Sequence, residues 1–586
     1  MANVNFVSFH SINLNSVAMK KKYFFVLFLF PAFLVAQIPF TSTITPDLSA
    51  YGEGTNYPGE GEYQIFLSAD NILDKPIFVV DGFDPGDTRD IAGLYSSLDF
   101  TGTSGPQNLA DLVRAEGFDI VILNFPTYVR AADGTTVDGG ADFMERNAML
   151  LVDLINIINT DKAANSPEQN VIIGPSMGGI ISRYALNYME NQTLNADTRL
   201  YISFDSPHHG ANVPIGLQHQ LNFLANNPLS PVAELDPIIE GFLKSPAARQ
   251  LLIDHFESHL SGADEYTFDS SLTLPEAHPY RTTFEANINS LTTTGFPENV
   301  RNVAIINGSG IGSAYLAKDG VTPVTNGFTI ADMTLPIDSG FIGVINVEIG
   351  LNMTPSAGTA QQVSRFFAPL LPPIVPNLES IADSGTTNFD GVDAAPGGLF
   401  DLSGITGDIG AGGGIAGDFL AALQIDKFSF IPSVSALALE ITSETSGDNI
   451  DWFHDINIAS RGTTDITPFD NTYLPDDNEP HVQLTESNVA FALSEILTPP
   501  LSIIDDVASE FRLEKNPIES DLVLLNNSVL NEAYISIIDM TGKVLFNSNQ
   551  ELTERTVLPV NLNSGLYLLN IATRNGQSHS IKVLVK

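Results

Sequence analysis

The sequence of 586 residues contains no cysteine. Without thiols the chain has no disulfide bonds, no thiolate-bound zinc and no cysteine nucleophile. Any covalent catalysis must therefore use a hydroxyl group, with imidazole and carboxylate side chains as the partners that move protons.

Basic residues are also scarce. Lys and Arg number 26 against 69 Asp and Glu, so the formal net charge is −43. A chain of this charge is repelled by a polyanion such as DNA and by a bare anionic membrane surface, which excludes nucleic-acid binding as its main function. The length exceeds one ordinary domain, and 43% hydrophobic residues are typical of a folded protein.

An apolar run from Tyr23 to Ala36 is too short to span a membrane and follows three consecutive lysines, Lys20–Lys22. A basic segment, an apolar segment and small residues before Gln37 are the features of a signal peptide. We therefore predict a signal peptide over residues 1–36, with Met19 as an alternative start. A buried N-terminal helix is the alternative that the basic cluster disfavours.

The end of the chain has a different pattern from the rest. Alternating apolar and polar residues at 521–525, 533–539 and 544–546, with a turn at 540–543, predict a small β-sandwich. The order Asn516-Pro517, Ile538–Lys543, Ser564–Leu569 resembles the type A C-terminal sorting domain of the type IX secretion system.

That resemblance covers residues 506–586 and implies a partner, the type IX secretion machinery. It also implies export through the periplasm and the outer membrane, so that the protein is secreted or held at the cell surface. A carbohydrate-binding β-module is the alternative interpretation of the tail.

Between residues 76 and 210, apolar β-rich runs alternate with helical patterns. This alternation predicts the α/β class, with a mostly parallel sheet covered by helices. We expect a catalytic domain over residues 37–500 that is interrupted by two insertions, at about 212–299 and about 320–425. The first is helical and apolar and predicts a cap over the active site, whereas the role of the second is not predicted.

A glycine-rich turn interrupts this alternation at Gly174-Pro175-Ser176-Met177-Gly178-Gly179. It follows an apolar strand at 171–173 and precedes a helical stripe, which is the setting that a G-x-S-x-G nucleophile elbow requires. Glycines beside the serine permit the strained turn that exposes its hydroxyl group. Ser176 is therefore the predicted nucleophile, and an incidental serine in a turn is the weaker alternative.

Segments 176–186 and 206–211 resemble segments of lipases and related esterases of the α/β-hydrolase superfamily. The resemblance spans about 70–310 and returns near 428–495. It implies a secreted carboxylester hydrolase that acts on hydrophobic esters, such as lipids or polyesters, through an acyl-enzyme and without a cofactor. It also implies an oxyanion hole from the backbone N–H groups of Phe83 and Met177, although Asp81-Gly82 replaces the usual His-Gly.

A serine nucleophile needs an imidazole base. His481 lies after the last expected core strand and before a helical run at 488–496, where this fold presents its base, and it is the predicted base. His454 is the main rival, and His208 and His209 are expected to shape the loop after their strand.

The predicted acid is Asp205, at the end of the strand 200–204, which gives the chain order Ser176, Asp205, His481. The more common position, after the strand 302–307, offers no acid. Asp426, Asp390 and Asp393 therefore remain alternatives.

Three further alternatives stay open. The same triad is suited to amide or peptide cleavage, and a degenerate hydrolase scaffold is suited to binding or adhesion at the cell surface. The group Asp81, Asp84 and Asp87, or the Asp-rich stretch 390–408, could collect calcium, but neither has the spacing of a known calcium loop. We therefore predict no metal.

Overall fold

The computed structural model of this chain describes residues 37–228, 231–338, 343–402, 415–439, 449–456, 466–497, 511–518, 521–526, 530–539, 543–560, 562–573 and 578–586. The chain divides into two compact units, residues 1–484 and 485–586. The expected signal peptide at 1–36 and the junction at 498–510 lie outside the described residues, so the expected domain limits stay predictions. No helix in the described segments is long and apolar enough to cross a membrane.

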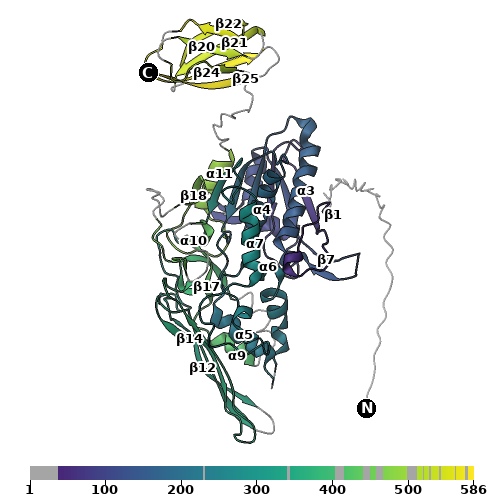
Figure 1. Cartoon of the computed structure of the whole chain (residues 1–586), viewed down its shortest axis with the longest axis vertical. Coiled ribbons are helices and arrows are strands. Elements are labelled where there is room, and N and C mark those ends of the chain that lie inside the picture. Colours follow the sequence, from purple (N-terminus) through teal and green to yellow (C-terminus); the bar gives the residue numbers. More distant parts are fainter. Residues whose placement is uncertain are drawn as a thin grey trace, which may run out of the picture. The chain divides into compact units, whose positions relative to one another are not determined.

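A sheet of eight strands forms the centre of the first unit (Figure 1). In spatial order the strands are β1 (Ile38–Thr41), β2 (Glu60–Phe66), β6 (Asp119–Asn124), β3 (Pro76–Val80), β9 (Asn170–Pro175), β10 (Thr198–Phe204), β11 (Arg301–Ile305) and β18 (Asn471–Tyr473). The pairs from β6 to β18 are parallel, whereas β1, β2 and β6 pair antiparallel. Strands β3 and β6 are buried along their whole length, which explains their continuous apolar sequences.

Helices cover this sheet. They are α1 (Ile91–Ser96), α2 (Leu109–Ala115), α3 (Met144–Lys162) and α4 (Met177–Asn191). Asp90 and Asn108 begin α1 and α2 by accepting a hydrogen bond from the main chain of the first turn. Helices α3 and α4 pack against each other and bury their apolar faces in one core. The expected α/β class is confirmed.

The segments that connect these elements contain two short hairpins. They are β4 (Asp99–Gly102) with β5 (Gly105–Asn108) and β7 (Thr127–Val129) with β8 (Thr136–Asp138).

The first insertion lies between β10 and β11 and is helical. It contains α5 (Ile215–Asn226), a π-helical turn at Pro237–Leu243, α6 (Pro246–Leu251) and α7 (Pro279–Ser290). Ser245 caps α6, because its hydroxyl accepts a hydrogen bond from Ala248 N at 3.2 Å. The buried side chains of this insertion belong to the same hydrophobic core as the central sheet.

The second insertion, between β11 and β18, is mainly a separate antiparallel sheet. Its strands, in spatial order, are β12 (Thr329–Asp338), β13 (Val344–Asn352), β14 (Ala360–Ala368) and β15 (Leu378–Gly385). Helix α5 packs on this sheet so closely that a Cβ on Gly216 would lie 2.3 Å from the carbonyl oxygen of Val363. A second antiparallel pair follows, β16 (Gly397–Asp401) with β17 (Lys427–Pro432), together with helices α9 (Ile415–Ala422) and α10 (Ser433–Ala436).

The second unit begins with helix α11 (Glu486–Leu497) and continues as two antiparallel sheets. One contains β19 (Phe511–Leu513), β20 (Leu522–Asn526) and β23 (Arg555–Leu558), and the other contains β22 (Val544–Leu552), β21 (Leu530–Asp539), β24 (Gly565–Thr573) and β25 (Ser578–Val585). Side chains such as Ile535, Ile537 and Leu569 form a common core. The expected small β-sandwich is confirmed, and most of the expected turn at 540–543 lies outside the described residues.

Candidate active site

Ser176 stands in a sharp turn between β9 and α4. Its backbone has φ 54° and ψ −131°, in a region that residues with a side chain seldom adopt. A Cβ on Gly174 would lie 2.5 Å from the Cα of Gly179, and a Cβ on Gly178 would lie 2.3 Å from the carbonyl oxygen of Val80. Glycine is therefore required on both sides of the serine for the helix to start so close to the strand.

Three of the predicted residues lie in one hydrogen-bonded chain. The Oγ of Ser176 is 2.8 Å from Nε2 of His481, and Nδ1 of His481 is 2.7 Å from Oδ2 of Asp205. Because a carboxylate only accepts, Nδ1 carries the proton and Nε2 is free to accept the proton of the serine hydroxyl. Asp205 is fully buried, and 12% of the His481 side chain is exposed.

The carboxylate of Asp205 is held on several sides. The residue has φ 49°, and its N–H donates to the carbonyl oxygen of Ile305 at 2.7 Å. Its second oxygen, Oδ1, accepts the N–H of Asn307 at 3.1 Å. Gly398 leaves the space that the carboxylate fills, because a Cβ there would lie 2.0 Å from Oδ2.

His481 is positioned by the second insertion. Its N–H donates to the carbonyl oxygen of Leu399 in β16 at 2.8 Å, and Leu399 N–H donates to the carbonyl oxygen of Glu479 at 3.0 Å. The ring of Phe430, from β17, meets the imidazole edge to face, with 5.1 Å between centroids. The sequence left the role of residues 320–425 open, and the structure places part of that segment directly beside the imidazole.

The two residues expected to supply the oxyanion donors lie near Ser176. A Cβ on Gly82 would lie 3.2 Å from the Cβ of Ser176 and 3.7 Å from Met177 N, so the loop after β3 touches the elbow. Met177 is the first residue of α4, and its N–H therefore has no acceptor within the helix. Phe83, the residue after Gly82, lines the same pocket as Ser176.

An ion pair between the half-exposed Arg89 and the buried Asp81 holds this loop. Nη2 of Arg89 lies 3.1 Å from Oδ1 of Asp81 and donates to the carbonyl oxygen of Phe83 at 3.1 Å. The N–H of Arg89 donates to Asp84 at 2.8 Å. Burial raises the pKa of Asp81 to about 7, although Arg89 opposes this shift. Sequence reasoning missed Arg89, and the signal available was one arginine within the acidic loop 81–90.

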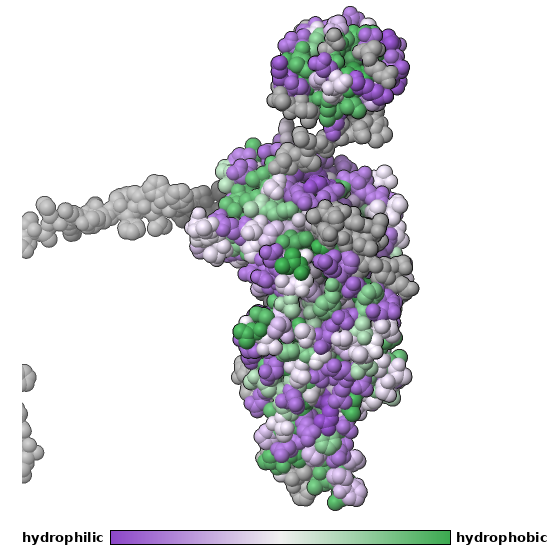
Figure 2. All heavy atoms as spheres, turned by 90° about the vertical axis from the view of Figure 1, so that its left-hand side faces the viewer, coloured by the Kyte–Doolittle hydropathy of each residue, from purple (hydrophilic) through white to green (hydrophobic). Residues whose placement is uncertain are grey.

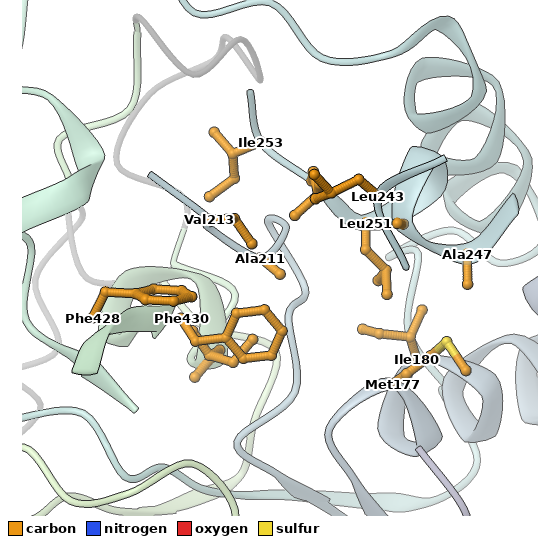
Figure 3. Packing of buried hydrophobic residues seen from close by; sticks show 14 of the residues in the cluster. Met177, Ile180, Ala211, Val213, Leu243, Ala247, Leu251, Ile253, Phe428 and Phe430 are labelled. Carbon is orange, nitrogen blue, oxygen red and sulfur yellow. The ribbon is translucent and has the colours of Figure 1, made fainter. Parts of the chain in front are cut away.

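An apolar pocket adjoins the serine hydroxyl. Its volume is about 10 Å³, which is room for one water molecule. Side chains from the cap and from β17 line it, and Figure 3 shows three of them, Ala211, Leu251 and Phe430. From the cap, Phe242 packs edge to face on Phe83, with 4.8 Å between centroids. The pocket is lined by Phe83, Ser176, Pro207, Ala211, Phe242, Ala248, Leu251, Leu252, Phe430 and Ile431.

The rival histidines have other contacts. Nδ1 of His454 lies 3.9 Å from Asp451. His208 is buried with Nε2 2.8 Å from the hydroxyl of Ser203, and Nε2 of His209 lies 3.0 Å from the carbonyl oxygen of Leu439.

Two of the rival acids use their carboxylates elsewhere. Oδ2 of Asp393 accepts the N–H of Thr354 at 2.9 Å, and Oδ1 of Asp390 accepts the N–H of Ala357 at 2.8 Å. Asp426 accepts a hydrogen bond from Leu402 N through its main-chain carbonyl at 2.8 Å. Among the residues that the structure describes, no group of three or more His, Asp or Glu side chains is arranged to hold a metal ion.

Two protein families match parts of the chain. Residues 88–227 match the PGAP1-like alpha/beta domain, and residues 516–586 match the secretion system C-terminal sorting domain. The chain is an α/β-hydrolase-fold protein with a type IX sorting domain. The protein is therefore exported to the cell surface or the medium, and its tail interacts with the secretion machinery.

The chain has distant likenesses among solved structures. An α/β serine hydrolase, XC6422 from Xanthomonas campestris, is 12% identical over 29% of this chain and 62% of its own, with a TM-score of 0.18. Est1E from Butyrivibrio proteoclasticus is 8% identical over 45% of this chain and 77% of its own, with a TM-score of 0.21. The peroxisomal α/β-hydrolase Lpx1 from Saccharomyces cerevisiae is 12% identical over 46% and 73%, with a TM-score of 0.24. None of the curated proteins matches the chain.

Proposed function

We propose that the exported protein is a serine carboxylester hydrolase that acts through an acyl-enzyme on Ser176. The observation that carries this proposal is the continuous chain of hydrogen bonds from Ser176 Oγ through His481 to Asp205, at 2.8 and 2.7 Å. A serine hydroxyl becomes an effective nucleophile when a positioned imidazole takes its proton, and the carboxylate stabilises the resulting imidazolium.

In the proposed reaction, Ser176 Oγ attacks the ester carbonyl carbon while Nε2 of His481 accepts the hydroxyl proton. The N–H groups of Met177 and Phe83 stabilise the oxyanion of the tetrahedral intermediate. His481 then donates its proton to the departing alcohol, which leaves the acyl group on Ser176. Water attacks this acyl-enzyme with His481 again as the base, and the carboxylic acid is released.

The pocket supports a hydrophobic acyl group as the substrate. Its lining is apolar apart from Ser176, and a chain of net charge −43 disfavours anionic substrates. Lipid and polyester esters fit this chemistry. The volume of about 10 Å³ leaves no room for a long acyl chain unless cap side chains such as Phe242 and Leu251 move.

The test is hydrolysis of p-nitrophenyl esters of graded chain length by the full chain and by three variants. We expect Ser176→Ala and His481→Ala to lower kcat by about 10⁴-fold or more, and Asp205→Asn by about 10⁴-fold with the fold retained. His454→Ala is the matched control and should leave kcat unchanged, because its contacts lie elsewhere.

Two outcomes would contradict the proposal. A wild-type protein that cleaves amides faster than matched esters would make it an amidase or peptidase with the same triad. A wild-type protein that turns over neither substrate, and whose Ser176 is not labelled by a fluorophosphonate, would instead support a binding or adhesion function on a hydrolase scaffold.

A further inference from the structure

The antiparallel sheet of the second insertion consists of two hairpins, β12–β13 and β14–β15, which turn at the same end of the sheet. Glu348 pairs with Phe367 in the antiparallel register of β13 and β14. In an antiparallel pair each step back along β13 is a step forward along β14, so the start of β13 and the loop after β14 lie at the same end of the sheet. Val344, which pairs with Asp338 of β12, and the loop 369–377, which joins β14 to β15, therefore lie at the same end of the sheet and are together called the hairpin tip.

The hairpin tip is apolar and exposed. Ile374 is 83% exposed, Val344 68% and Leu371 43%. No charged residue occurs between positions 366 and 378, in a chain that carries 69 acidic residues. At the lower end of the first unit, where this sheet ends in Figure 1, Figure 2 shows hydrophobic residues interspersed with hydrophilic ones. Exposed apolar surface that is free of charge over a whole loop marks an interaction site.

The main chain of the loop is also unusually poor in free hydrogen-bond donors. Four of the residues from 369 to 376 are proline and have no N–H. The N–H of Leu370 donates to Oδ1 of Asn377 at 3.1 Å, and those of Ile374 and Val375 donate to the carbonyl oxygen of Leu371 at 2.7 and 2.9 Å. Moving this loop from water into the interfacial region of a bilayer therefore dehydrates few unpaired N–H donors, which lowers the cost of shallow insertion.

We propose that the hairpin tip anchors the protein on a neutral lipid surface. A net charge of −43 repels an anionic surface, so apolar insertion is the contribution that remains. A specific protein partner needs a buried patch of about 800 Å² on each side, which a convex tip of a few side chains does not offer, whereas lipid surrounds a convex loop.

This proposal rests on the proposed function and refines it, because the ester substrate becomes an aggregated lipid. The sheet that bears the tip packs on the cap through Phe223 of α5 and Phe366 of β14, with 4.9 Å between ring centroids. Anchoring at the tip therefore holds the cap, and the pocket below it, near the lipid.

The experiment is co-sedimentation of the full chain with phosphatidylcholine vesicles. We expect Ile374→Ser to weaken partitioning about 10-fold, and Ile374→Ser with Leu371→Ser about 100-fold, since each substitution removes a large apolar side chain from the inserted surface. Ile311→Ser is the matched control, because Ile311 is 66% exposed in a loop outside the tip, and its variant should bind as wild type. Hydrolysis of soluble p-nitrophenyl acetate should be the same in all of these proteins.

Wild-type protein that does not sediment with the vesicles, or tip variants that sediment as well as wild type, would overturn the proposal. Sedimentation velocity without lipid adds a further test, since a dimer that Ile374→Ser converts to a monomer would make the tip an interface between two copies. Binding is also measured with Ser176→Ala. Vesicle binding that requires the tip in a protein inactive on every ester would leave the anchor standing and reject the proposed esterase.

Discussion

The two sides of the candidate active site are built in different ways. The nucleophile side is continuous in the chain, because β9, the elbow and α4 occupy residues 170–191. The imidazole side is not, since His481 lies 305 residues after Ser176 and depends on β16 for its position. The first is fixed within one continuous segment of main chain, and the second by contacts between segments that lie far apart in the sequence.

The surroundings of two glycines show this difference. A Cβ on Gly178 would meet main-chain oxygens, at 2.3 Å from Val80 O and 2.7 Å from Asp81 O, whereas a Cβ on Gly398 would meet the side-chain oxygen of Asp205. A side chain can rotate away from a new methyl group, but a strand in the middle of a sheet cannot. A substitution on the nucleophile side should therefore lower stability, whereas one on the imidazole side should lower activity and leave the fold intact.

Gly178→Ala should have the largest effect, because it forces α4 away from β3 and disrupts the core beneath the elbow. We expect a loss of about 3–5 kcal/mol in the free energy of unfolding, together with loss of fluorophosphonate labelling. Thermal unfolding followed by circular dichroism measures the first. Gly417→Ala is the control, because a Cβ there meets nothing within 4 Å. Equal melting temperatures for the two variants would show that the elbow is not constrained as described.

Gly398→Ala should retain the fold and lose activity. The new methyl group displaces the carboxylate of Asp205 from His481, so we expect kcat to fall by about 10³- to 10⁴-fold, approaching the effect of removing the charge of the acid. Ester hydrolysis is measured beside circular dichroism. A variant that keeps wild-type kcat would mean that the Asp205–His481 contact is not needed.

Arg89→Ala should lower kcat less than Gly398→Ala does, because Arg89 positions the loop that carries Phe83 without touching substrate. Loss of one oxyanion donor costs about 10²–10³-fold in kcat, and we expect a fall of about 10- to 100-fold from a loosened loop, with KM little changed. Arg89→Lys should restore only part of the activity, because a lysine cannot hold Asp81 and the carbonyl oxygen of Phe83 together.

The control for Arg89 is Arg365→Ala, which removes an arginine of similar exposure (31% against 38%) from an ion pair with Glu348 in the second insertion. If both arginine variants lower kcat equally, or if Arg89→Ala changes KM alone, the positioning role of Arg89 is wrong.

The same difference decides what the sequence could predict. The fold class and the elbow follow from patterns within a few residues, such as the strand before Gly174 and the helical stripe after Ser176. Asp205 was preferred on its place at a strand end, but Asp426, Asp390 and Asp393 stayed open because nothing local in a sequence states which acid meets a histidine 276 residues away.

The contacts that a sequence does not display are those that cross an insertion. Gly398 is one glycine among 46 in the sequence, and its function becomes visible only when the carboxylate of Asp205 is beside it. The catalytic roles of Ser176, His481 and Asp205 remain predictions until the variants are measured.

The smallest expected effect comes from a second histidine–aspartate pair, which lies in the cap. Nε2 of His259 lies 2.5 Å from Oδ1 of Asp254, and Nδ1 lies 2.8 Å from the carbonyl oxygen of Leu272. Both ring nitrogens therefore face acceptors, whereas His481 keeps Nε2 for a hydroxyl group. Burial lowers the pKa of His259, but Asp254 and Leu272 outweigh it and raise the pKa to about 9.

A histidine whose pKa is raised from 6.5 to about 9 by folding stabilises the folded state fully below pH 6.5, and this stabilisation is lost as the pH rises through 9. The melting temperature of the wild type should therefore fall between pH 6.5 and 9 by more than that of His259→Gln, whose neutral side chain binds no proton. His454→Gln should keep the wild-type slope. Equal slopes for wild type and His259→Gln would show that the cap pair is not held charged, and that the two histidine–aspartate pairs do not differ in the way their acceptors suggest.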